Sequence, residues 1–147
     1  MEALEFLQAL VDLPLCYGLK YSDTELYELG FGKMDIVTTR YGNEKKVCTH
    51  ILHILCRFKV IWKNGERKVD KYYEDTPSEK FHSEAERIVG LKVRRVALSD
   101  KNDLWLDLDD CWIVFATSED GEESWRFFTS NEDATHLVAS DSWVYFI

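Results

Sequence analysis

Short runs of strand-forming residues, separated by turn residues, recur along almost the whole chain and limit what it can fold into. These runs are rich in Val, Ile, Leu and aromatic residues, which favour β-strands. They occupy residues 15–21, 26–31, 34–39, 47–62, 67–73, 91–98, 104–108, 112–117, 124–129 and 137–147. Because the turns between them are short, consecutive strands are expected to pair as antiparallel meanders in one or two sheets.

Two segments have helical spacing instead. Leucines recur at helical intervals within residues 2–11, just before Pro14. A second helix is predicted for residues 78–89, with Pro77 at its start and Gly90 at its end. The predicted fold class is therefore α+β, with antiparallel β-meanders and two helices packed on them.

The length of 147 residues corresponds to one ordinary domain, which can bury a core without a metal or a disulfide. We predict a single domain over residues 1–147. A short internal similarity relates residues 11–15 to residues 89–93, and each segment leads from a helix into a strand, a turn and a second strand. This similarity predicts two related repeat units, residues 2–73 and residues 78–147.

The amino terminus and the cysteines favour a cytoplasmic location. The first residues are acidic and lack a small-residue cleavage site, unlike a secretory signal. No apolar run reaches the roughly 18 to 20 residues of a membrane-spanning helix, so we predict no membrane partner. The four cysteines have no close pair spacing and are expected to be reduced and buried; they are Cys16, Cys48, Cys56 and Cys111.

The acidic residues are concentrated in the last third of the sequence. The formal net charge is −9, yet residues 1–98 contain 16 Lys and Arg against 15 Asp and Glu, whereas residues 99–147 contain 2 against 12. A negative overall charge disfavours direct nucleic-acid binding, because phosphates require a basic surface. A field of one sign attracts a cationic partner. The alternative is a solvated surface that only keeps the protein soluble.

One aromatic residue in this acidic third is a candidate binding anchor. Trp105 alternates with leucines and should point away from their face, on the side that Asp107 and Asp109 share by strand parity. Tryptophans often dominate interface energetics. The predicted partner-binding residues are Trp105, Asp107, Asp109, Asp110, Glu122 and Glu123. The alternative is a strand that helices cover on both faces.

The sequence contains no catalytic or metal signature, so no cofactor is predicted. Cys48, His50, His53 and Cys56 have ligand chemistry, but a strand would place His53 on the opposite face from the other three, which favours core packing. Nucleophile elbows, phosphate-binding glycine loops and calcium loops are absent from the sequence. If the protein is instead a small enzyme or a ligand-binding domain, His53 and Arg57 are the first candidates for its pocket. A third alternative is a subunit of a homo-oligomer, which would present a large apolar patch.

The run Leu52-His53-Ile54-Leu55-Cys56-Arg57-Phe58-Lys59-Val60 resembles a motif of a group of small uncharacterised bacterial proteins. Their pattern is approximately Leu-His-Ile-Gln-Cys-Pro/Ser-Trp-Arg-Ile, and here Leu55 and Arg57-Phe58 depart from it. The blocks at residues 29–32 and 125–128 are also similar. Some members of that group resemble immunity proteins, which neutralise toxins exchanged between competing bacteria, so the resemblance implies an inhibitor.

Taken together, these features predict a non-enzymatic binding protein. In the immunity-type version of this hypothesis, the acidic last third docks on the basic surface of a toxin. The alternative class is the small enzyme or ligand-binding domain with a pocket near His53 and Arg57.

Overall fold

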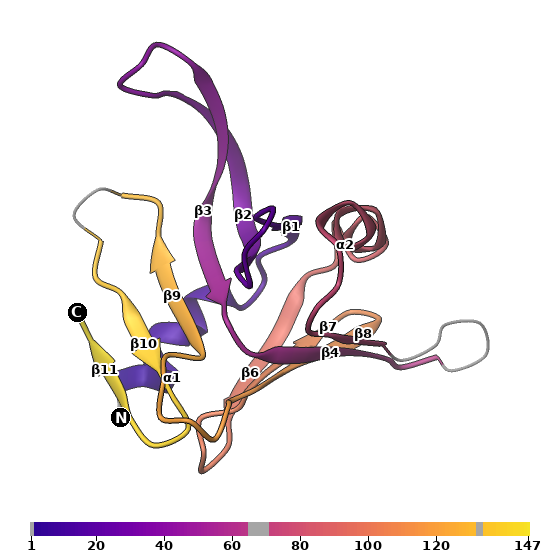
Figure 1. Cartoon of the computed structure of the whole chain (residues 1–147), viewed down its shortest axis with the longest axis vertical. Helices are drawn as coiled ribbons and strands as arrows, with labels where there is room; N and C mark the ends of the chain where they lie inside the picture. Colours follow the sequence, from indigo (N-terminus) through magenta and orange to yellow (C-terminus); the bar gives the residue numbers. More distant parts are fainter. Residues whose placement is uncertain (1, 65–70, 132–133) are drawn as a thin grey trace.

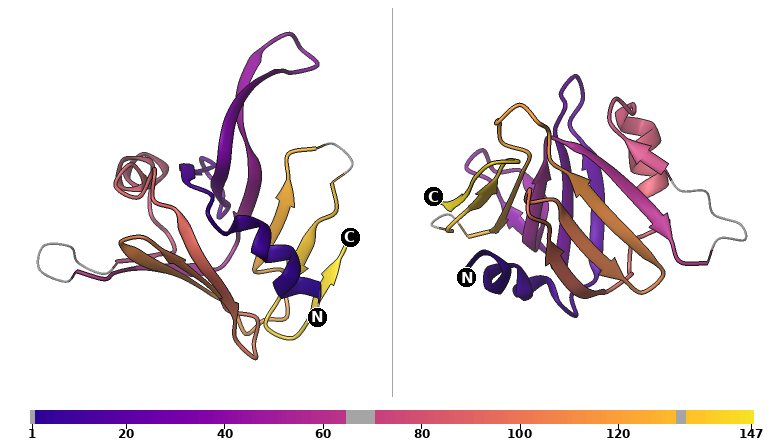
Figure 2. Two further views of the ribbon diagram at one scale, coloured as in Figure 1. Left: turned by 180° about the vertical axis from the view of Figure 1, so that it is seen from behind. Right: turned by 90° about the horizontal axis from the view of Figure 1, so that it is seen from below.

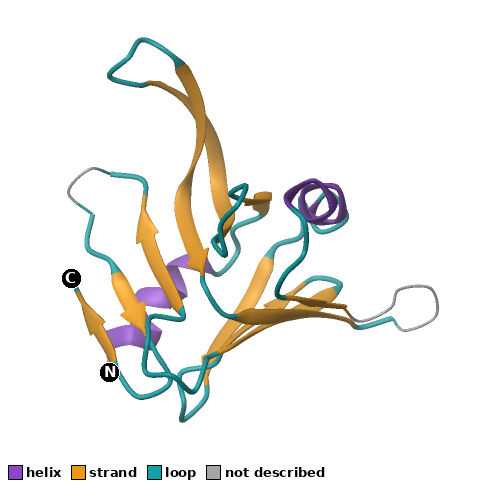
Figure 3. Cartoon of the chain, viewed as in Figure 1, coloured by secondary structure: helices purple, strands orange, loops and turns teal. Residues whose placement is uncertain are grey.

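The protein is α+β and consists of two antiparallel sheets with two short α-helices, which confirms the predicted fold class (Figure 1 and Figure 3). The computed structural model describes residues 2–64, 71–131 and 134–147. The sheets contain six and five strands. They diverge like the two sides of a V, and their inner faces enclose the core (Figure 1).

The six-stranded sheet has the order β1-β2-β3-β9-β10-β11. Its strands are β1 (Leu15–Lys20), β2 (Tyr27–Thr38), β3 (Glu44–Ile54), β9 (Trp125–Thr129), β10 (Leu137–Ala139) and β11 (Val144–Phe146). The five-stranded sheet has the order β5-β4-β8-β7-β6. Its strands are β5 (Lys71–Tyr73), β4 (Arg57–Trp62), β8 (Cys111–Ala116), β7 (Leu104–Leu108) and β6 (Val93–Leu98). The helices are α1 (Glu2–Leu7), followed by the 3₁₀ turn η1 (Gln8–Leu10), and α2 (Ser78–Ala85).

Each half of the chain contributes strands to both sheets. The first half consists of α1, a three-strand meander in the six-stranded sheet, and then β4 and β5 in the five-stranded sheet. The second half repeats this order with the sheets exchanged: α2, the meander β6 to β8 in the five-stranded sheet, and then β9 to β11 in the six-stranded sheet. Two crossovers, β3 to β4 and β8 to β9, therefore run between the sheets.

The two similar segments of the sequence lie beside each other and hydrogen-bond symmetrically. Asp12 N donates to Val93 O at 2.7 Å, and Gly90 N donates to Leu15 O at 2.8 Å, so the two donors lie 78 residues apart and so do the two acceptors. Asp12 and Gly90 both have positive φ, 71° and 92°. The hydrogen bonding thus follows the register of the predicted repeat, and a common origin of the halves stays a prediction.

The core fills the space between the sheets, and a helix closes each side of it. Helix α2 packs on β1, while α1 and η1 contact β6 (Figures 1 and 2). An aromatic cluster lies at the centre, where Phe81 of α2 meets Tyr27 and Phe58 with ring centroids 4.8 and 5.8 Å apart. Each ring buried in this way contributes about 2 to 3 kcal/mol of stabilisation. No described helix is long and apolar enough to span a membrane.

Three predicted strand boundaries were wrong. Strand β2 is continuous where two strands were expected, because a bulge between Phe31 and Met34, with Gly32 at φ 96°, bends the strand instead of ending it. Beyond this bulge, β2 and β3 project from the sheet as a two-stranded arm (Figure 1). The long run 47–62 is interrupted where the chain crosses between sheets. The carboxyl-terminal run 137–147 folds back as the pair β10 and β11.

Other expectations need smaller adjustments. Helix α2 ends at Ala85, and a turn continues to Gly90. Between the runs 47–62 and 67–73, the dipeptide Asn64-Gly65 is typical of a hairpin turn; this turn lies partly outside the described residues, as does most of the returning strand, because residues 65–70 are not described. Residues 111–116 are apolar at successive positions, which predicts a central strand covered on both faces; β8 is central in its sheet, but its outward side chains are only half-buried.

Candidate functional site

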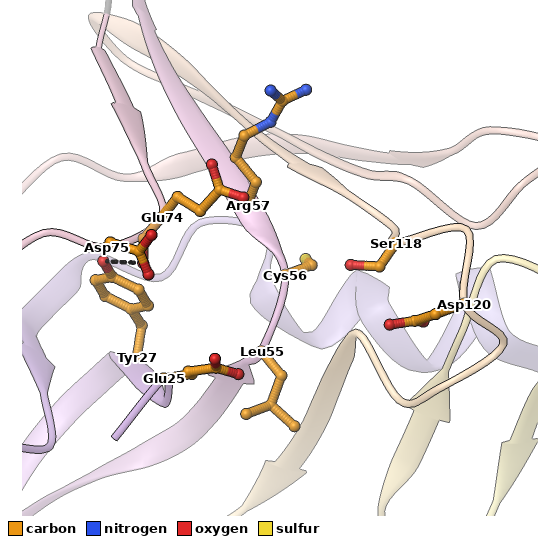
Figure 4. Close-up of a pocket in the computed structure, with 9 residues that line it drawn as sticks. All are labelled: Glu25, Tyr27, Leu55, Cys56, Arg57, Glu74, Asp75, Ser118 and Asp120. Atoms are coloured by element: carbon orange, nitrogen blue, oxygen red, sulfur yellow. Dashed lines mark hydrogen bonds between the residues drawn. The ribbon is translucent and has the colours of Figure 1, made fainter. Parts of the chain in front are cut away.

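A pocket of about 330 Å³ lies where the chain passes between the two sheets (Figure 4). We call it the crossover pocket. It is lined by Glu25, Tyr27, Leu55, Cys56, Arg57, Glu74, Asp75, Ser118 and Asp120. These residues come from the start of β2, the β3–β4 crossover, the segment after β5 and the β8–β9 loop.

Both crossovers contribute residues to the lining of this pocket. The β3–β4 crossover is only two residues long, Leu55 and Cys56, because the chain turns directly from one sheet into the other. Leu55 N donates a hydrogen bond to Ser124 O of the β8–β9 loop at 2.8 Å, which ties the crossovers together. Leu55 is 42% exposed, so the pocket has an apolar side chain among its polar ones.

The pocket is strongly acidic. Four of its residues carry carboxylates, namely Glu25, Glu74, Asp75 and Asp120. None of these carboxylates forms an ion pair with any residue in the described ranges. Arg57 does not neutralise them, because its guanidinium carbon lies over the Tyr72 ring, 4.6 Å from the centroid, and points away from the pocket in Figure 4. The site therefore favours a cationic occupant.

Two other residues fix the walls of the pocket. The Tyr27 hydroxyl donates to Glu74 O at 3.0 Å and accepts a hydrogen bond from Thr76 N at 3.3 Å, which holds the segment after β5 against β2. Cys56 is buried, and this burial raises the pKa of its thiol to about 12. A thiol that stays protonated at neutral pH is a poor nucleophile, so Cys56 is suited to a structural role.

Arg57 lines this pocket, but His53 does not. The two residues were predicted to line one pocket, but the chain changes sheets between them. His53 is on the outer face of the six-stranded sheet, where its Nε2 lies 2.7 Å from Glu28 Oε1. Tyr17 and Tyr21 donate their hydroxyl hydrogens to the same carboxylate, at 2.5 and 2.9 Å.

The Glu28 carboxylate is the centre of this second polar cluster. Its burial raises the pKa, but the hydrogen bonds from His53, Tyr17 and Tyr21 outweigh this effect and lower the pKa of Glu28 below its ordinary value. Burial and the same carboxylate raise the pKa of Tyr21 to about 12 and raise that of Tyr17 further. Glu28 thus stays ionised with its acceptor positions occupied, which is the pattern of a stabilising network.

The six predicted partner-binding residues do not form one surface. The β7–β8 turn, with Asp109 and Asp110, is at one end of the five-stranded sheet, and the β8–β9 loop, with Glu122 and Glu123, is at the other. Asp109 and Glu123 are also engaged within the chain. Asp109 Oδ1 lies 2.6 Å from Arg94 Nε, and Arg126 donates to both carboxylate oxygens of Glu123 at 2.7 and 3.1 Å.

Trp105 and Asp107 share one face, as strand parity predicts, but the charge around them is positive. The Asp107 carboxylate lies 2.5 Å from Lys63 Nζ and 3.1 Å from Arg95 Nε, and its side chain is 9% exposed. Burial raises the pKa of Asp107, but Lys63 and Arg95 outweigh it and lower the pKa. Asp107 therefore neutralises part of a cationic face and does not present a free carboxylate beside Trp105.

The four residues with ligand chemistry are dispersed. Cys48 is buried on β3, and His50 stacks on Phe127 with its Nδ1 2.8 Å from Thr49 Oγ1. Cys56 lies in the crossover, and His53 faces outward. Within the described part of the chain, no three His, Cys, Asp or Glu side chains gather closely enough to hold a metal ion.

Comparison with known proteins gives no relative: no family model, no curated protein and no solved structure matches the chain.

The acidic residues of the crossover pocket were not identified from the sequence. Glu25, Glu74, Asp75 and Asp120 come from three segments that are far apart along the chain, and each resembles an ordinary turn residue. Only the third segment, the β8–β9 loop, belongs to the acidic last third.

Proposed function

We propose that the protein is a non-enzymatic binding protein whose crossover pocket takes a basic side chain of a partner protein. The observation that carries this proposal is the concave site with four carboxylates and no ion-pair partner for them among the described residues. A lysine or arginine entering it would gain several charge-assisted contacts, and Leu55 offers apolar surface for the aliphatic part of such a side chain.

The proposal keeps the predicted positive charge of the partner but places the docking surface at the crossover pocket. The resemblance at residues 52–60 supports an immunity-type inhibitor, which would cover the basic surface of a toxin. The crossover that this motif forms is also the wall of the pocket. A cytoplasmic location is part of the proposal, and the four cysteines, all free, agree with it.

A pair of variants with equal charge changes tests the proposal. The pocket variant carries E25Q, E74Q, D75N and D120N, and the control variant removes four exposed carboxylates elsewhere with E2Q, E5Q, D35N and E44Q. Each variant and the wild-type protein serve as bait for proteins of the native host. The association rate of each captured and purified protein is then measured at low and high salt.

The expected result is a basic protein that the wild type and the control variant bind and the pocket variant does not. Its association with the pocket variant should be slower at low salt, by about tenfold or more, and should depend less on salt. Inhibition of an activity of that protein would support the immunity-type version. The proposal is refuted if the two variants bind the same proteins at the same rates.

A further inference from the structure

The outer face of the five-stranded sheet carries four cations, although the chain as a whole is acidic. Arg57, Lys59 and Lys63 point outward at alternate positions on β4 and just after it, and Arg95 points outward on β6. Among the described residues of this face, Asp107 is the carboxylate beside them, and these five residues together have a formal charge of +3, whereas the chain has −9. The cations on β4 form a row about 20 Å long, because alternate strand residues are about 6.6 Å apart.

Three aromatic rings lie among these cations. Tyr72 is 52% exposed and Trp105 is 38% exposed, and the Trp105 ring meets Trp112 with a centroid distance of 6.1 Å. The cations are held over the rings: Lys59 Nζ lies 4.8 Å from the centroid of Tyr72, and Arg95 Cζ lies 5.5 Å from that of Trp112. These contacts position the charged groups beside the aromatic rings before any ligand binds.

Neither α-helix covers this face. In the right-hand view of Figure 2, strands β4, β8 and β7 lie in front, and the two described helices lie to the sides. Carboxylates gather at other places, among them the crossover pocket and the turns that hold Asp109 and Glu119 to Glu123. The negative net charge of the sequence therefore does not describe this face.

We propose that the outer sheet face, formed by Arg57, Lys59, Lys63, Tyr72, Arg95, Trp105 and Trp112, binds single-stranded nucleic acid. The phosphates would contact the row of cations while unpaired bases stack on the exposed rings, the combination that sheet surfaces use for single strands. The carboxylates of an acidic peptide would satisfy the cations, but they have no flat rings to stack on Trp105. The observations thus favour nucleic acid over an acidic protein.

Binding of labelled oligonucleotides tests this inference. The fluorescence anisotropy of labelled dT12 and rU12 is measured with the purified protein between 50 and 200 mM salt. Four cations predict a slope of log Kd against log salt near 3, because a single strand releases about 0.7 counterion per neutralised phosphate; this slope corresponds to about 50-fold weaker binding over that range. The inference is overturned if neither oligonucleotide binds, or if the affinity does not depend on salt.

Matched variants locate the binding on the face. W105A is expected to weaken oligonucleotide binding about fivefold or more, because stacking on one ring contributes about that much, whereas Y41A on the exposed arm should have no effect. R57Q with K59Q should weaken binding and lower the salt slope by about 1.4, while K45Q with K46Q, the same charge change on the arm, should not. Equal losses in the face and arm variants would refute the assignment.

A variant that is expected to bind more tightly separates an effect on binding from loss of the fold. Asp107→Asn removes the carboxylate that pairs with Lys63 and Arg95 and should tighten oligonucleotide binding, because both cations are then available to the phosphates. A variant that simply unfolds would weaken binding instead, and its circular dichroism spectrum identifies that case. In a folded variant, weaker or unchanged binding contradicts the proposed contact.

An acidic competitor tests the choice of ligand class. If a glutamate dodecamer binds as tightly as dT12 and loses affinity in the same variants, the face recognises acidic protein and the nucleic-acid assignment is wrong. Oligonucleotide binding by the outer sheet face is independent of the proposed function. The crossover-pocket variant keeps all seven residues of the face, so loss of the partner protein and loss of the oligonucleotide are separate outcomes.

Discussion

Glu28→Gln is the substitution that best tests the polar network on the six-stranded sheet. The carboxylate accepts hydrogen bonds from the Tyr17 and Tyr21 hydroxyls and lies 2.7 Å from His53 Nε2, and its side chain is 8% exposed. Glutamine has almost the same shape, but one of its two terminal atoms is a donor. At least one of the three partners therefore faces a donor instead of an acceptor.

The expected cost follows from the loss of charged hydrogen bonds. A hydrogen bond to a charged group is worth about 1.5 to 3 kcal/mol, and the tyrosine hydroxyls can partly reorient, so we expect the free energy of unfolding to fall by about 2 to 3 kcal/mol at pH 7. For a chain of this length, the melting temperature should fall by about 4 to 12 °C. Urea unfolding followed by tryptophan fluorescence measures the difference, and Glu44→Gln at an exposed position of β3 is the control.

The pH dependence of this difference has a definite sign. The folded protein lowers the pKa of Glu28, so its ionised form stabilises the fold fully above the unfolded pKa of about 4.3. This stabilisation is lost as the pH falls below that value and through the folded pKa. The gap between wild type and Glu28→Gln should thus persist at pH 5 and shrink below about pH 4. A difference under about 0.5 kcal/mol at pH 7, or one that does not change down to pH 3, would refute the reasoning.

Three further predictions concern buried positions. Gly30→Ala should destabilise the fold by about 1 to 3 kcal/mol in urea unfolding, because the added methyl overlaps the Tyr17 ring; a loss below the error of the measurement would contradict this packing. Trp125→Phe removes the hydrogen bond from the indole Nε1 to Asn102 O at 2.9 Å and leaves a void, so a loss of about 2 to 4 kcal/mol is expected in the same assay. Cys56 should be labelled by iodoacetamide at pH 8 at least about tenfold more slowly in the native protein than in urea, as peptide mass spectrometry can measure, and equal rates would show that its thiol is accessible and ionisable.

The secondary structure and fold class were predictable because their signals are local. Alternating apolar residues and turn residues identify antiparallel strands wherever they occur, and strand parity correctly placed Trp105 and Asp107 on one face. The boundaries that failed depend on contacts between distant residues. The end of β3 at Ile54 has no glycine or proline to mark it in the sequence. The strand ends there because the chain changes sheets, and the next strand pairs with β8, a partner more than 50 residues away.

The sites depend on tertiary structure for the same reason. A sequence gives the sign of a charge and the face of a strand, but the field at a point on the surface depends on which strands lie beside it. Lys63 and Arg95 surround Asp107 only because β4 and β6 belong to the same sheet as β7. The sequence alone determined an acidic α+β chain of antiparallel strands. Only the tertiary structure decided that four carboxylates with no ion-pair partner among the described residues line the crossover pocket while Trp105 lies on a cationic face, because side chains brought together from separate segments create both environments.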